Sequence, residues 1–180
     1  MKANPHLLAA ALALGLTACG TPDPPTPPAP TTPAFGGTDA AWIEIIIAMD
    51  EELLPLLDLA PSHAGSGSLK AASEQVRAFT NDELGTLRQL HAEAALPAEN
   101  PHKGMPMPGM VTPAVLASAE ALSGKAFDEV LTNSIREHLE QGQKLAAGEL
   151  SAGTESRTKE LAGRIIETRK STLKNLPKDF

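Results

Sequence analysis

The chain has 180 residues and a formal net charge of −7, with 15 Lys and Arg against 22 Asp and Glu. Nucleic-acid-binding proteins gather basic side chains against phosphate, and this sequence has no basic cluster. One Trp, four Phe and no Tyr leave little material for platforms that stack on bases or sugars. The single Cys excludes an internal disulfide, so any folded domain must be stabilised by its core.

Residues 1–18 have the form of an export signal. Lys2 precedes an apolar run from Leu7 to Leu16, and small residues stand just before Cys19. The run is too short to cross a hydrocarbon core of ~30 Å as a helix that rises 1.5 Å per residue. We therefore expect residues 1–18 to be a signal peptide that is removed on export.

Cys19 is the predicted site of lipid attachment. The four residues from Leu16 to Cys19 resemble the lipobox cut by lipoprotein signal peptidase, and they contain the only cysteine of the chain. The alternative is an ordinary secretory signal followed by an incidental cysteine. The lipobox predicts an exported lipoprotein, held to a membrane on its periplasmic or extracellular side by two or three acyl chains.

Residues 19–38 are interpreted as a tether. From Thr21 to Pro33 the sequence is nearly all Pro and Thr, a composition that favours extended polyproline II and cannot bury a core. At ~3 Å per residue this stretch would span on the order of 40 Å.

After the tether, four long segments carry apolar residues at helical spacing, and none shows sustained strand alternation. Pro55 interrupts the first segment, so a kink is expected near Leu54. Gly and Ser residues between 64 and 68 supply a turn after it, and Thr112-Pro113 looks like an N-cap followed by a first-turn proline. The expected helices are about 39–60, 69–95, a short one from 113 to about 122, 125–150, and one from after 154 to about 176.

The two helix pairs look like copies of one another. Gly-Thr-Leu-Arg-Gln-Leu at 85–90 matches Ser-Thr-Leu-Lys-Asn-Leu at 171–176 in residue class at nearly every position. A helical hairpin cannot bury its apolar face alone, so two copies are expected to pack together. The predicted fold is all-α, a four-helix bundle made of two repeated helical hairpins over residues 39–176.

Three stretches carry a resemblance to a known family. They are Met-Pro-Gly-Met-Val-Thr at 107–112, Ala-Leu-Ser-Gly-Lys-Ala-Phe-Asp at 121–128 and Ile-Arg-Glu-His at 135–138. With Asp-Ala-Ala-Trp at 39–42, they resemble the exported bacterial family catalogued as domain of unknown function 305. That resemblance implies a ferritin-like bundle of duplicated hairpins, often associated with copper.

The family pattern places paired histidines, Met-Ile-x-His-His-x-x-Ala-x-x-Met-Ala, in each hairpin, and this chain departs from it. His138 keeps the first histidine of the second hairpin, but Leu139 replaces the second. In the first hairpin Met49 and Asp50 stand where the pair would be. His138 and Met49 are thus candidate ligands for a soft ion such as Cu(I). The alternative is a buried structural histidine beside a methionine that fills core space.

The loop at 102–110 is the densest cluster of candidate ligands. Thioethers on a loop bent by Pro and Gly can converge on Cu(I), whereas the alternative is that some of them plug the seam between the hairpins. The candidates are His102, Met105, Met107 and Met110.

No catalytic constellation emerges from the sequence. A ferritin-like di-iron centre needs Glu-x-x-His pairs, but Arg88 and Ile135 stand three residues before His91 and His138. We therefore expect that the protein is not an enzyme. One hypothesis is an envelope lipoprotein that binds or buffers copper; the other is a structural or protein-interaction module whose metal site has decayed.

Overall fold

The computed structural model describes residues 34–177, and the predicted signal peptide, Cys19 and most of the tether lie outside them. Over this range the chain is helical and contains no strand. None of its helices is long and apolar enough to cross a membrane. The helices are α1 Gly37–His63, α2 Gly67–Glu93, α3 Pro113–Glu120, α4 Gly124–Ala152 and α5 Ser156–Asn175.

The all-α prediction is confirmed, and the helix ends follow local chemistry. The Thr112 side chain accepts a hydrogen bond from the Val115 N–H, with proline at the first helical position, as the sequence predicted. Ser66 caps α2 in the same way. Helix α1 runs on through Pro55 and Pro61 and ends three residues later than expected, at His63.

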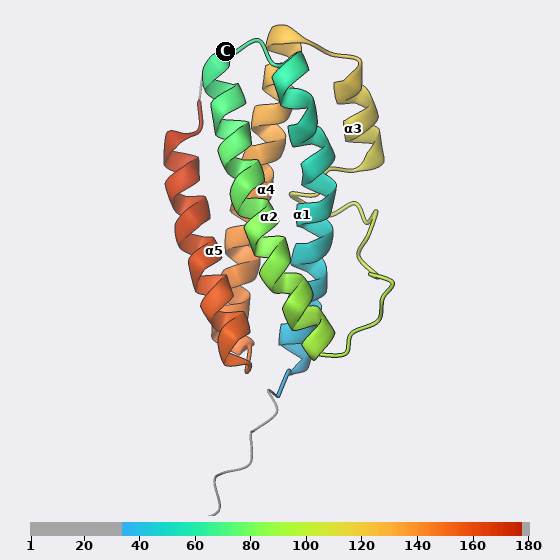
Figure 1. Ribbon diagram of the computed structural model, residues 1–180, viewed down its shortest axis with the longest axis vertical. Helices are drawn as coiled ribbons and strands as arrows, with labels where there is room; N and C mark the ends of the chain where they lie inside the picture. Colours follow the sequence, from blue (N-terminus) through green and yellow to red (C-terminus); the bar gives the residue numbers. More distant parts are fainter. Residues whose placement is uncertain (1–33, 178–180) are drawn as a thin grey trace, which may run out of the picture. The chain divides into compact units, whose positions relative to one another are not determined.

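The four long helices form two hairpins that lie side by side (Figure 1). Helix α1 packs against α2, α4 packs against α5, and α1 also packs against α4, whereas α2 and α5 touch more sparsely. The long connection after α2 runs along the outside of the bundle to the short α3, which packs on α1 and α4. This arrangement is the bundle of paired hairpins that the repeat predicted.

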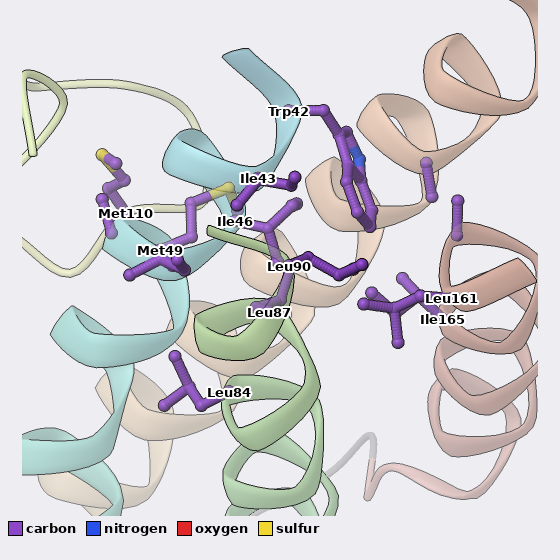
Figure 2. Packing of buried hydrophobic residues seen from close by; sticks show 14 residues of the cluster. Trp42, Ile43, Ile46, Met49, Leu84, Leu87, Leu90, Met110, Leu161 and Ile165 are labelled. Atoms are coloured by element: carbon purple, nitrogen blue, oxygen red, sulfur yellow. The ribbon is translucent and has the colours of Figure 1, made fainter. Parts of the chain in front are cut away.

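The core consists of two apolar clusters at different heights in the bundle. The first joins the early half of α1 to the end of α2, the late half of α4 and the start of α5, with Trp42, Met49 and Leu87 among its members (Figure 2). The second joins the late half of α1 to the starts of α2 and α4, including Leu53 and Phe127. The boundary between the clusters falls in the middle of each long helix.

Candidate functional site

Charged side chains fill the boundary between the two apolar clusters. Each long helix contributes one of them: Asp50 from α1, Glu83 from α2, His138 from α4 and Arg169 from α5. Glu83 is 7% exposed, and the other three are fully buried. These four residues, called the central cluster below, bring opposite charges together where water is excluded.

Three of these side chains meet at one atom of the fourth. The Nη2 atom of Arg169 lies 3.1 Å from Glu83 Oε2 and 3.3 Å from Asp50 Oδ1. It also lies 3.4 Å from His138 Nε2, which is itself 3.3 Å from Asp50 Oδ1. A single guanidinium nitrogen therefore occupies the point on which two carboxylates and an imidazole converge.

Gly142 makes room for the guanidinium. This residue lies on α4 one turn after His138, and a Cβ built there would stand 2.6 Å from Arg169 Nε. That separation is shorter than real Cβ contacts, so any larger residue would displace the arginine. The glycine on the buried face of α4 is thus explained by the long side chain that arrives from α5.

Burial sets the ionisation of the central cluster. It lowers the pKa of His138, although Asp50 acts in the opposite direction, so the imidazole is uncharged at neutral pH. Burial raises the pKa of Glu83 to about 7, with Asp50 adding to the rise and Arg169 opposing it. The Arg169 guanidinium, a group that does not lose its charge in proteins, lies 3.3 Å from Asp50 Oδ1.

Glu83 also forms part of the wall of a crevice between α2 and α5. This cavity of about 220 Å³ is lined by Phe79, Asp82 and Thr86 of α2 and by Leu161, Arg164 and Thr168 of α5. The crevice and the central cluster therefore share the Glu83 side chain, which lies between them.

The ligands predicted from sequence fall in two different surroundings. His138 belongs to the central cluster, and the α1 side chain that contacts it is Asp50, one position after the predicted Met49. Met49 is buried in the first apolar cluster together with Met110 of the loop (Figure 2). That Met49 and His138 share an ion stays a prediction.

The Met-rich loop is partly packed into the fold. Met107 is half-buried against the first apolar cluster, whereas Met105 is 41% exposed. His102 is half-buried, and its ring Nδ1 has no hydrogen-bond partner. Gly109, at φ 79°, lies so close to α4 that an added Cβ would stand 3.2 Å from the His138 Cα. The loop thus reaches the central cluster through its backbone.

A second buried polar cluster lies at the start of α1. The Asp39 carboxylate accepts hydrogen bonds from the backbone N–H groups of Gly36, Thr154 and Glu155. Although burial acts in the other direction, the Glu149 side chain, the Thr154 hydroxyl and these N–H groups hold the Asp39 pKa well below its usual range. Burial and the Asp39 carboxylate raise the pKa of Glu149 to about 8. Asp39 is therefore ionised and Glu149 protonated at neutral pH.

Comparisons with known proteins identify the family of this chain. Residues 39–178 match the family model described as domain of unknown function (DUF305). The chain belongs to the DUF305 family. No curated protein matches this DUF305 chain.

Two solved structures share the fold of this DUF305 protein. One is a candidate secreted DUF305 protein from Streptomyces coelicolor, with a TM-score of 0.68 and 20% identity over 77% of this chain and 89% of that one. The other is a DUF305 fragment from Deinococcus radiodurans, with a TM-score of 0.73 and 12% identity over 80% of this chain and 95% of that one. At these identities the likeness establishes the fold.

The centre of this DUF305 bundle does not fit a metal ion. Imidazole and carboxylate are good ligands, but here they surround a guanidinium nitrogen, and a second cation at the same point would meet a positive charge. Within residues 34–177, no group of three or more His, Cys, Asp or Glu side chains is arranged to hold a metal. The copper that the resemblance implied has no place beside Arg169.

In this DUF305 chain the sequence pattern predicts His138 as a site residue but not the other three members of the central cluster. Asp50 stands in a histidine position of the family pattern, and no family motif points to Glu83 or Arg169. A signal was present, because Arg169 stands four residues after Ile165 and three before Thr172, on the predicted buried stripe of the last helix. A charge on an apolar stripe is the sign of a paired buried group.

Proposed function

We propose that this DUF305 protein is a lipid-anchored, non-catalytic helical module of the cell envelope that acts by holding a protein partner. The observation that carries the proposal is the closed central cluster. In ferritin-like proteins the bundle centre holds the reactive metals, and here Arg169 fills it with an internal ion pair. The acidic and histidine side chains at the centre of this bundle are instead paired with Arg169, and these contacts join the four helices.

Export and anchoring rest on the first nineteen residues and are supported by the relative from Streptomyces coelicolor, described as a candidate secreted protein. The test is metabolic labelling with a radioactive fatty acid, followed by membrane fractionation. The unchanged chain should carry label and sediment with membranes, and Cys19→Ala should lose both properties. Mass spectrometry of the mature N-terminus that finds an unmodified Cys19, or cleavage elsewhere, would refute lipid anchoring.

A cavity of about 470 Å³ on the side of the bundle supports the interaction role. It lies between α1, the loop before α3 and the start of α3, with Val111 and Leu116 among its apolar lining residues and Glu51 and Lys103 at its polar side. The loop wall is fixed by a hydrogen bond from the Asn100 side chain to the Glu44 carbonyl. A preformed cavity of this size can receive side chains of a partner.

Photo-crosslinking in intact cells tests this surface. A photoreactive residue at position 116, in the cavity, should give one discrete crosslinked envelope protein, and the same residue at exposed position 160 on α5 should give none. Equal products from both positions, or none from either, would contradict a docking role for the cavity.

Copper binding by the loop is the second candidate, favoured by two features. The Met105 thioether is exposed, and the ring Nδ1 of His102, on the same turn, lacks a partner. If the loop takes Cu(I), titration against a chelator should give stoichiometric binding that Met105→Leu weakens and Met49→Leu, in the core, leaves unchanged. Equal affinities for both variants would reject the loop as the site.

A further inference from the structure

The central cluster has the composition of a metal site around a group that is not a metal. Its inward atoms are one imidazole nitrogen, His138 Nε2, and two carboxylate oxygens, Asp50 Oδ1 and Glu83 Oε2. Imidazole and carboxylate are the usual ligands of Zn²⁺, Co²⁺ and similar divalent ions. All three atoms lie within 3.4 Å of Arg169 Nη2. They therefore share one centre.

We propose that the point held by Arg169 Nη2 is a latent site for a divalent transition-metal ion, in which the guanidinium takes the place of the ion and keeps metals out. The cation is then part of the chain, and the bundle needs no metal to join its four helices. This inference concerns the interior alone and does not depend on lipid anchoring or on a partner.

The distances fit the guanidinium and are too long for a bound metal ion. Zinc and cobalt bind nitrogen and oxygen at about 2.0 to 2.2 Å. The three atoms stand 3.1 to 3.4 Å from Nη2, so each would move inward by about 1 Å once the guanidinium is removed. The three ligands come from three different helices, so the movement requires the rotation of three separate side chains. Three protein ligands would leave a fourth position for water.

The geometry also provides space and a route. Gly142 leaves α4 without a side chain beside the guanidinium, so truncation of Arg169 would open a cavity next to the three ligands. The crevice between α2 and α5 reaches Glu83 from outside. An ion that enters there meets its first carboxylate at the edge of the central cluster.

The experiment compares the unchanged chain with Arg169→Ala, both purified at full length, using Zn²⁺ and Co²⁺ as probes. Arg169→Ala should unfold at a lower temperature, and an excess of Zn²⁺ of ~100 times its dissociation constant should raise its midpoint by roughly 5 to 10 °C. Co²⁺ should give one equivalent of binding with visible ligand-field absorption. The unchanged chain should show neither effect.

Two further variants test the assignment of residues. Arg164→Ala removes an exposed arginine from the same helix and should show no metal response. Arg169→Ala combined with His138→Ala should bind Co²⁺ at least ~10-fold more weakly than Arg169→Ala, because one proposed ligand is gone.

The latent site can be tested whether or not Arg169→Ala folds alone. If this variant is unfolded without metal, the same titration is followed by helical circular dichroism, and refolding with Zn²⁺ but not with Mg²⁺ supports the latent site. The proposal is overturned if Arg169→Ala, folded or not, fails to respond to either metal. It is also overturned if the unchanged chain binds metal with the same dependence on His138.

Discussion

Replacement of Gly142 by alanine isolates the packing of the buried guanidinium. The new Cβ would stand 2.6 Å from Nε, 2.8 Å from Cζ and 3.0 Å from Cδ of Arg169. Overpacking of a dense interior costs ~1–3 kcal/mol, and separation of a buried ion pair costs ~3–5 kcal/mol. Alanine returns ~1 kcal/mol through its better helix propensity. We therefore expect Gly142→Ala to lower the free energy of unfolding by about 0 to 2 kcal/mol if Arg169 only shifts within its site, and by about 2 to 4 kcal/mol if its ion pairs separate.

Urea unfolding followed by circular dichroism measures this loss, and the chain contains a matched control. Gly148 lies on the same helix and is exposed, and a Cβ added there would meet no atom within 4 Å, so Gly148→Ala should stabilise by up to ~1 kcal/mol. In an Arg169→Ala background the cost of Gly142→Ala should disappear, because the clashing atoms are gone. Equal stabilities of Gly142→Ala and Gly148→Ala would refute the packing argument.

The polar cluster at the start of α1 and the Asp128 side chain of α4 give further predictions. The pKa of Glu149, about 8 in the folded chain, lies above its unfolded value of 4.5, so its contribution to stability is complete below pH 4.5 and is lost as the pH rises towards 8. Urea unfolding at several pH values measures this decline. Glu149→Gln should reduce the fall in the free energy of unfolding by at most about 1.4 kcal/mol per pH unit. The same fall in the variant and the unchanged chain would contradict the role of Glu149. Asp128 accepts the N–H groups of Gly65 and Ser66 at 3.0 Å, and Asp128→Ala should cost about 1 to 3 kcal/mol. Hydrogen exchange should then accelerate at Gly65, and a protected Gly65 amide would argue against the role of Asp128.

The fold could be predicted because each helix is marked by local sequence signals. Apolar residues at helical spacing, the Thr112-Pro113 cap and the Gly-Ser turn before Leu69 each depend on a few neighbouring residues. The repeat then restricts the pairing of helices, since each hairpin must cover the other. These signals do not depend on how the hairpins are shifted along one another.

The candidate site depends on that shift, so the sequence predicts only part of it. His138 and Asp50 lie 88 positions apart, and their contact follows from the packing of α1 on α4. Glu83 and Arg169 occupy corresponding places in the two copies, 86 residues apart, like the matching segments that begin at Gly85 and Ser171. The repeat therefore contained the information that these two residues meet, but only the folded chain shows that they do.

The bonds of Asp39 have a mechanical consequence. Tension that reaches the domain along the chain is received at Gly36, whose N–H is held by the Asp39 carboxylate. The same carboxylate holds Thr154 and Glu155, in the turn between α4 and α5. Force at the start of α1 is thus shared between both hairpins. The first turn of α1 cannot unfold without also breaking the hydrogen bonds from Thr154 and Glu155 to Asp39. Force applied at Gly36 is therefore resisted by hydrogen bonds that end in α1 and by hydrogen bonds that end in the turn between α4 and α5.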